Sequence, residues 1–148
     1  TNPPCTTRQS KNDVPVRKEA VVVGQKAREI QQMKRQRAEA RGRRGEAIAA
    51  WWLRLHGWRI LGERVRNPRG EVDLIARRGR TLAFIEVKAR VKDADLAKAI
   101  DAYRLRRVAA AAESLLHKYS KGTDEVRIDV ILVAPWRIPR HLVNVWHG

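Results

Sequence analysis

A chain of 148 residues with 43% hydrophobic side chains has enough apolar material for one compact domain and is too short for two of ordinary size. Lysine and arginine outnumber aspartate and glutamate by 32 to 16, so the net charge of +16 favours nucleic acid, an anionic membrane surface or an acidic protein as partner. The single cysteine, Cys5, excludes an intrachain disulfide and therefore a small disulfide-stapled secreted scaffold. No apolar run approaches the length of a membrane span, so we expect a cytoplasmic protein without a membrane partner.

Residues 1–41 are predicted to form a basic arm that is largely disordered or a frayed helix. The stretch to about Lys18 holds three prolines among polar residues and shows no periodicity, which is typical of disorder. Residues 25–44 favour a helix but have few apolar side chains with which to dock on a core. Residues 1–45 carry a net charge of +8, half of the total. Two interpretations of the arm stay open: a contact for phosphates, or a solubilising tail.

The folded domain is predicted to span residues 42–148 and to begin with a helix over about 45–56, with Gly57 as its C-terminal stop. Large apolar residues recur on this helix at spacings that predict one buried stripe: Ile48, Trp51, Trp52 and Leu55. Short β-rich runs separated by turn signals predict three antiparallel strands: 58–61, 71–77 and 82–89.

A second helix is predicted over about 94–119, because this stretch is rich in alanine, lacks proline and glycine, and has an apolar face. The residues of that face are Ile100, Tyr103, Arg107, Val108, Ala111 and Leu115. A strand over 126–134 follows, and a last one over 142–146 after the prolines at 135 and 139. The predicted order is therefore αβββαβ with a further strand at the end.

The hairpin around Gly79 predicts where its charged residues lie. A two-residue turn at Gly79-Arg80 has glycine at the first central position, as type II′ turns prefer. In that register Asp73 lies opposite Glu86, and Glu71 opposite Lys88. The face with Val72, Leu74 and Ile85 is then a core face, whereas the other face carries the charges. A three-residue turn would move Asp73 to the opposite face.

Two opposed carboxylates repel each other unless a cation lies between them, which makes Asp73 and Glu86 candidate metal ligands. A hard cation such as Mg²⁺ or Mn²⁺ binds one or two carboxylates and completes its shell with water and phosphate oxygens. Lys88 could then orient the attacking water and stabilise charge on a phosphate. The alternative is structural: Lys88 pairs with Glu71 and neutralises a carboxylate cluster that has no catalytic role.

Three sequence blocks resemble the YraN family, bacterial predicted endonucleases similar to archaeal Holliday-junction resolvases. The blocks are GEAIAAWWLRLHGWRIL, RNPRGEVDLIARRGRTLAFIEVKAR and VRIDVILV, within residues 42–146. The wider group is the PD-(D/E)xK nucleases, whose motif is matched here by Asp73, twelve intervening residues, Glu86, Val87 and Lys88. The resemblance implies an α/β fold of the restriction-endonuclease type, a mixed central sheet flanked by helices, behind the basic N-terminal extension.

The resemblance also implies roles for individual residues. Asp73 and Glu86 would bind metal, the Val87 carbonyl would be a third ligand, and Lys88 would be the catalytic lysine. Glu46, on the opening helix, is a further candidate for catalysis and metal binding. Its alternative role is that of a first-turn acid favourable to the helix dipole. Val72 stands where the motif has proline, and Arg104 where a lysine is expected, which weakens any acid–base role there.

Candidate nucleic-acid contacts are the arginines Arg90, Arg104 and Arg107, for which a solvated-face interpretation competes. Asp129, between two apolar strand residues, is interpreted as structural. The histidines at 56, 117, 141 and 147 are scattered and are interpreted as surface or capping residues.

The resulting function hypothesis is a Mg²⁺- or Mn²⁺-dependent endonuclease that hydrolyses phosphodiester bonds of DNA, including branched or structured DNA. The alternative is a catalytically silent nucleic-acid-binding module on the same fold. A protein-interaction role, with the basic arm on an acidic surface, ranks last. Because resolvase relatives make two symmetric cuts, a homodimer is a further expectation.

Overall fold

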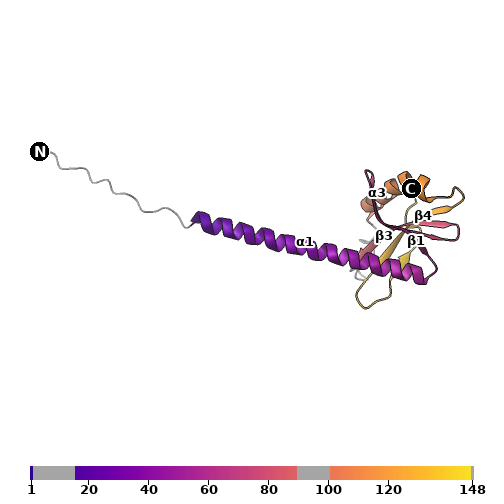
Figure 1. The fold of residues 1–148 in the computed structure, drawn as a ribbon, viewed down its shortest axis with the longest axis horizontal. Helices are drawn as coiled ribbons and strands as arrows, with labels where there is room; N and C mark the ends of the chain where they lie inside the picture. The colour runs from indigo at the N-terminus through magenta and orange to yellow at the C-terminus, as the bar shows by residue number, and fades with distance from the viewer. Residues whose placement is uncertain (2–15, 90–100, 148) are drawn as a thin grey trace. The chain divides into compact units, whose positions relative to one another are not determined.

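The computed structural model describes residue 1, residues 16–89 and residues 101–147. In these ranges the chain forms two helices and five strands (Figure 1). Their bounds are α1 Val16–Leu55, β1 Arg59–Asn67, β2 Gly70–Arg78, β3 Thr81–Ala89, α3 Ala102–Tyr119, β4 Glu125–Val133 and β5 Arg140–Leu142. The expected αβββαβ order with a final strand is confirmed.

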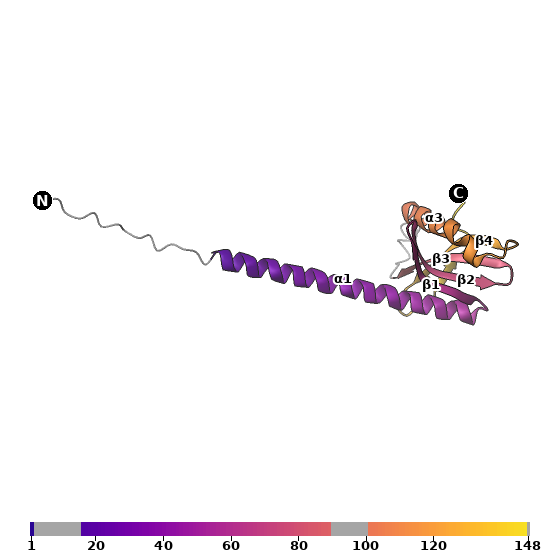
Figure 2. The same ribbon diagram turned by 45° about the horizontal axis from the view of Figure 1, so that its top comes forward.

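The strands form one mixed sheet in the order β1-β2-β3-β4-β5. Only the β3–β4 pair is parallel, and the connection that contains α3 links these two strands. Parallel neighbours require such a crossover, and its helix covers one face of the sheet. Figure 2 shows α3 and the C-terminal part of α1 on opposite sides of the strands. The α/β class with helices flanking a mixed sheet is therefore confirmed.

The chain divides into two compact units, residues 1–37 and residues 38–148, and α1 runs through the boundary as one helix. The helices expected over 25–44 and 45–56 are thus continuous, and α1 begins at Val16, within the stretch predicted to be disordered. Residues 2–15, the rest of that stretch, lie outside the described residues. The side chains at 21–37 are all exposed, as expected for a segment with few apolar residues.

The predicted buried stripe on the helix before Gly57 is wrong for three of its four residues, and of the four Trp52 packs against the core. Ile48, Trp51 and Leu55 are exposed by 41%, 64% and 63%, and the helix instead buries Gly45 and the set Ala49, Ala50 and Leu53. The physical reason is close approach: a Cβ at Gly45 would lie only 3.0 Å from Cβ of Ala89 on β3. Small side chains let the helix backbone approach the sheet, which turns the large ones outward.

Both faces of the sheet are apolar cores. Residues under α1 form one cluster: Ala49, Ala50, Leu53, Trp58, Leu74, Ala76, Ala83, Ile85, Ile131 and Val133. Residues under α3 form the other: Val72, Ile75, Leu82, Phe84, Leu105, Val108, Ala111, Ala112, Leu115, Ile128, Val130 and Leu132. The hairpin face expected to carry the charges is therefore apolar too, except at the end that holds the buried carboxylates Asp73 and Glu86.

The predicted two-residue turn and the register next to it are confirmed, whereas the predicted pairs Asp73–Glu86 and Glu71–Lys88 fall beyond the paired residues. Leu74 pairs with Ile85 and Arg78 with Thr81, and Gly79 has φ 59°, as a two-residue turn with glycine first requires. The β2–β3 pairs end one residue before Asp73 and Glu86. Val72 joins the α3 cluster rather than the side of Leu74. This change of face coincides with an irregularity at Arg64 on β1, which has φ 49°.

Helix α3 is shorter than predicted, and Asp101 caps its N-terminus by accepting a hydrogen bond from the Tyr103 backbone N–H at 2.9 Å. Residues 94–100, expected to be helical, lie outside the described residues. Val108, Ala111 and Leu115 are buried as expected, whereas Tyr103 and Arg107 are exposed, so the buried face is rotated toward Leu105 and Ala112.

The last strand, predicted over 142–146, is β5 Arg140–Leu142. Beyond it Asn144 has φ 51°, which breaks the extended backbone, although the Val145 N–H still donates to the Ile128 carbonyl at 2.9 Å. None of the helices in the described ranges is long and apolar enough to cross a membrane.

Candidate active site

The residues of the predicted motif lie at one end of the sheet, on three neighbouring elements. Asp73 is on β2, Glu86 and Lys88 are on β3, and Arg104 enters from the first turn of α3. Asp73 and Glu86 are 4% and 1% exposed, and Asp129 is the other acid buried in the described part of the chain. Buried carboxylates are rare without a partner, so this pair needs a specific account.

Asp73 forms a hydrogen bond with the backbone of β3 and feels the charge of Glu86. Its Oδ2 accepts a hydrogen bond from the Val87 N–H at 2.8 Å, a contact the sequence did not predict. Burial, and next the charge of Glu86, raise the pKa of Asp73 from 3.8 to about 7. Near neutral pH this carboxyl therefore holds a proton or requires a cation.

Glu86 is held by two cations at one oxygen. Its Oε1 accepts from Arg104 Nε at 2.8 Å and lies 3.3 Å from Lys88 Nζ. Its Oε2 is buried, and no described residue donates a hydrogen bond to it. A buried acceptor oxygen without a donor costs free energy, which a proton or a bound cation would recover.

Glu46 of α1 faces the same cluster. Its Oε2 forms an ion pair with Arg64 Nε at 3.2 Å, and its side chain is 15% exposed. Burial, followed by the charge of Asp73, raises the pKa of Glu46. Glu46 therefore lies within electrostatic range of Asp73. Its partner Arg64, at the irregular position of β1, had no signal in the sequence beyond its charge.

The structural alternative for Lys88 required a pair with Glu71. Instead Glu71 pairs with Arg66 at 3.2 Å, and Lys88 pairs with Glu86. Lys88 therefore contacts a member of the predicted motif, and its side chain is 27% exposed. An ammonium group at that position is both close to the carboxylates and accessible from solvent.

The three candidate arginines do not behave alike. Arg104 contacts Glu86 directly, and the charges of Glu86 and Asp73 raise its pKa although burial acts in the opposite direction. Arg107 is exposed and forms no hydrogen bond or ion pair with Asp73 or Glu86 within the described ranges. Its backbone carbonyl instead packs on Gly70, where a Cβ would lie only 2.6 Å from the oxygen. Arg90 lies outside the described residues. Arg104 was expected at the approach to the site, and its direct bond to Glu86 was missed.

Asp129 belongs to a separate network. It accepts hydrogen bonds from Arg127 Nε at 3.1 Å, His141 Nε2 at 2.7 Å and the Asn144 N–H at 2.8 Å. His141 is therefore a half-buried partner of a buried acid rather than a surface histidine. His56 does cap: its Nδ1 lies 2.7 Å from the Trp52 carbonyl near the end of α1.

The donor set can be tested against a divalent cation. No three acidic, histidine or cysteine side chains converge into a ready-made metal site in the ranges that the structure covers. Two adjacent buried carboxylates with one unsatisfied oxygen, Oε2 of Glu86, nevertheless fit Mg²⁺ or Mn²⁺, which take one or two carboxylates and complete their shell with water and substrate oxygens.

Comparison with known proteins shows which family the chain resembles. The model of the uncharacterised protein family UPF0102 matches residues 45–133, which include α1 from Gly45, the motif residues and β4. The chain belongs to the UPF0102 family. The resemblance to the YraN family is thereby confirmed, although the family description carries no activity.

The UPF0102 relatives include close ones. A protein of Rhizorhabdus wittichii is 71% identical over 115 residues, which cover 78% of this chain and 98% of the relative. One of Sphingopyxis alaskensis is 68% identical over 114 residues, with 77% and 98% covered. One of Caulobacter vibrioides is 48% identical over 110 residues, with 72% and 86% covered.

Proposed function

We propose that this chain is an endonuclease that hydrolyses phosphodiester bonds of DNA with Mg²⁺ or Mn²⁺, including branched or structured DNA. The observation that carries the proposal is the buried pair Asp73 and Glu86, which shares one end of the sheet with Lys88 and Arg104. A structural ion-pair cluster does not need two adjacent buried carboxylates with an unsatisfied oxygen.

In this proposal Asp73 and Glu86 hold the cation, and Glu46 and the Val87 carbonyl complete the protein ligands. The cation would supply Lewis-acid polarisation of the phosphate and a more acidic water. Lys88, which already contacts Glu86 and is partly exposed, would neutralise charge that builds on the phosphate. Arg104 would hold a non-bridging phosphate oxygen when it leaves Glu86.

A second function is favoured by one specific observation. Oε1 of Glu86 already has two cationic neighbours, Arg104 and Lys88, so the protein neutralises this carboxylate by itself. A UPF0102 chain in which that arrangement persists would bind nucleic acid through its basic surface without cutting it. The two functions make opposite predictions about metal binding.

The deciding experiment combines calorimetric titration of Mn²⁺ and Mg²⁺ with cleavage of labelled linear, single-stranded and four-way-junction DNA. Wild type and Asp73→Asn are compared, with Glu113→Gln, an exposed acid paired to Arg69, as the matched control. We expect Asp73→Asn to lose both metal binding and cleavage, and Glu113→Gln to keep both. DNA binding without metal binding in wild type would establish the silent module instead.

A further inference from the structure

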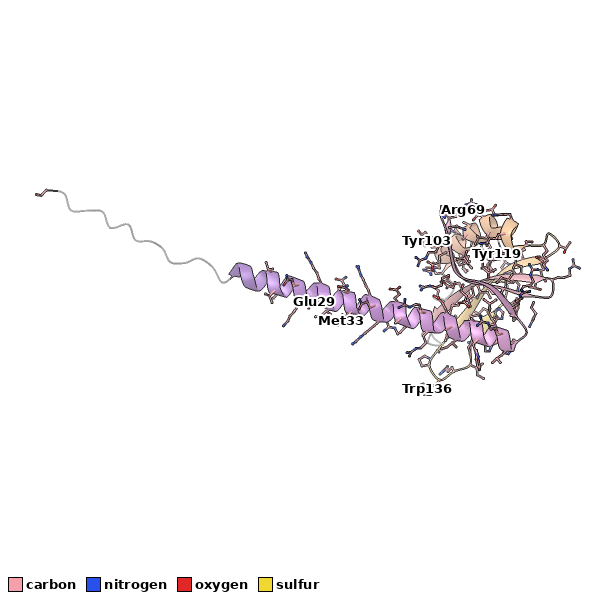
Figure 3. All side chains as sticks on the ribbon, viewed as in Figure 1. Glu29, Met33, Arg69, Tyr103, Tyr119 and Trp136 are labelled. Carbon is pink, nitrogen blue, oxygen red and sulfur yellow. The ribbon has the colours of Figure 1, made fainter. Side chains whose placement is uncertain are left out.

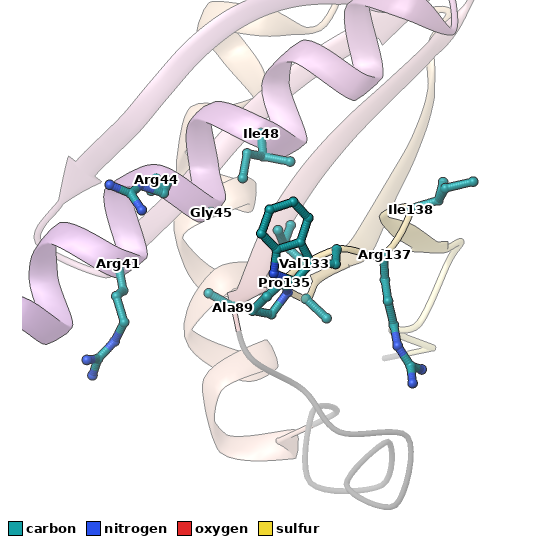
Figure 4. Close-up of a pocket in the computed structure, with 11 residues that line it drawn as sticks. Arg41, Arg44, Gly45, Ile48, Ala89, Val133, Pro135, Arg137 and Ile138 are labelled. Atoms are coloured by element: carbon teal, nitrogen blue, oxygen red, sulfur yellow. The ribbon is translucent and has the colours of Figure 1, made fainter.

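A groove runs beside the candidate active site, between α1 and the loop that joins β4 to β5 (Figure 4). Its volume is about 630 Å³. Ile48 of α1 and Ala89 of β3 line it together with Val133 and Pro135 on the loop side, so its floor is largely apolar. A groove of this size accommodates one or two nucleotides or a short peptide.

Trp136 on the wall of the groove is fully exposed, with a relative exposure of 104%, and Ile138 beside it is 81% exposed. The backbone of Trp136 has φ 59°, in the left-handed region that bulky residues rarely adopt. Figure 3 shows Trp136 projecting from the edge of the domain. A large aromatic ring that contributes so little to the core is available to stack on a ligand.

Among the described residues, the charged side chains that line the groove are all arginines. Arg41 and Arg44 of α1 and Arg137 of the loop line the groove, and no acidic side chain is among its described lining residues. In Figure 4 the side chains of Arg41 and Arg137 extend in the same direction on either side. An aromatic face between guanidinium groups matches a nucleobase between phosphates. A second copy of this strongly basic chain would be repelled, and an apolar peptide would offer no complementary charge.

The groove adjoins the candidate active site through the chain itself. Gly45 and Ala89 line the groove, and their neighbours Glu46 and Lys88 belong to the acidic cluster. Successive Cα atoms are about 3.8 Å apart. The groove and the residues around Glu86 therefore meet at the same end of β3.

We propose that this groove binds an unpaired segment of the DNA strand, with a base stacked on Trp136 and the flanking phosphates at Arg41 and Arg44. The inference rests on the proposed nucleic-acid function and adds to it the substrate class. Stacking on an exposed indole requires a free base face, which a continuous duplex does not offer. The substrate in this proposal is therefore DNA with single-stranded character.

The test measures binding of the full-length chain to a fluorescein-labelled single-stranded oligodeoxythymidine of about 15 nucleotides and to the corresponding duplex, without divalent metal. The variants are Trp136→Ala, Trp136→Phe and the paired change Arg41→Ala with Arg44→Ala. Trp51→Ala is the matched control, because Trp51 is an exposed tryptophan of α1 outside the groove. Sedimentation of each variant reports its oligomeric state.

We expect Trp136→Ala to weaken single-strand binding about tenfold or more, Trp136→Phe to keep most of it, and Trp51→Ala to be neutral. Duplex binding should not respond to Trp136. Equal binding by Trp136→Ala and wild type would overturn the groove inference and leave the nuclease proposal intact. An equal loss of duplex binding by Trp136→Ala would overturn the preference for unpaired strands. A shift of that variant from dimer to monomer with unchanged DNA binding would make the groove a self-association surface. No DNA binding by wild type would overturn both proposals.

Discussion

Arg104 Nε donates to Oε1 of Glu86 at 2.8 Å and so joins the first turn of α3 to the acidic end of β3. The arginine therefore lies beside the carboxylate that would also attract a divalent cation. We expect Arg104→Gln to bind Mn²⁺ about three- to tenfold more tightly, because a competing cation is removed from a partly exposed site, and to cleave DNA more slowly. Calorimetry and single-turnover cleavage measure the two effects. Arg106→Gln, an exposed neighbour, serves as control, and weaker metal binding in Arg104→Gln would contradict the competition.

Lys88 lies 3.3 Å from Oε1 of Glu86 and is 27% exposed. If it stabilises charge on the phosphate, Lys88→Met should lower the rate of cleavage by about a hundredfold or more and leave DNA affinity within a few-fold. Lys118→Met, which removes an exposed lysine of α3, is the control. A Lys88→Met protein that cleaves at the wild-type rate would remove the lysine from the mechanism.

Asp73 links the stability of the metal-free protein to pH. Its pKa is about 7 in the folded protein against an ordinary 3.8, so between these values the folded state binds more protons than the unfolded state. Wild-type stability should therefore fall as pH rises from about 4 to about 7 and stay lower above that window.

Asp73→Asn abolishes this titration. In urea unfolding with EDTA, the variant should match wild type near pH 4 and exceed its stability by about 1–3 kcal/mol near pH 8. Glu113→Gln reports the response of an exposed acid under the same conditions. A difference in stability between Asp73→Asn and wild type that does not change with pH would show that ionisation of Asp73 does not destabilise the folded protein.

Gly70 is packed against the backbone of α3. A Cβ there would lie 2.6 Å from the Arg107 carbonyl oxygen, and backbone cannot move aside as a flexible side chain does. Gly70→Ala should destabilise the domain by about 2–3 kcal/mol in chemical denaturation. Gly42→Ala, in open space on α1, should instead be neutral or stabilise by up to about 1 kcal/mol. Equal stability of the two variants would disprove the close packing.

Asp129 is expected to have a structural role. Its carboxylate is fully buried and bound by Arg127 and His141, whose side chains are 14% and 10% exposed. Asp129→Ala should destabilise the fold by about 3–5 kcal/mol because it leaves a buried guanidinium without its partner. Cleavage per folded molecule should be unchanged. A loss of activity without a loss of stability would place Asp129 in the catalytic machinery.

The local sequence was sufficient wherever short-range chemistry decides the structure. Glycine at position 79 selects the two-residue turn, and that turn determines which residues of β2 and β3 face each other. Period-two and helical patterns likewise predicted the order of elements, and the spacing of Asp73, Glu86 and Lys88 predicted the acidic end of the hairpin.

The tertiary structure decided what distant segments do to one another. Hydrophobicity alone placed Ile48, Trp51 and Leu55 in the core, but the close approach of Gly45 to Ala89 buries the small residues instead. The bond from Arg104 to Glu86 and the groove below Trp136 depend on the crossover that returns the chain over the sheet. Side-chain size and charge are properties of the sequence, whereas the partner of each side chain is decided only when helices and strands pack at contact distance.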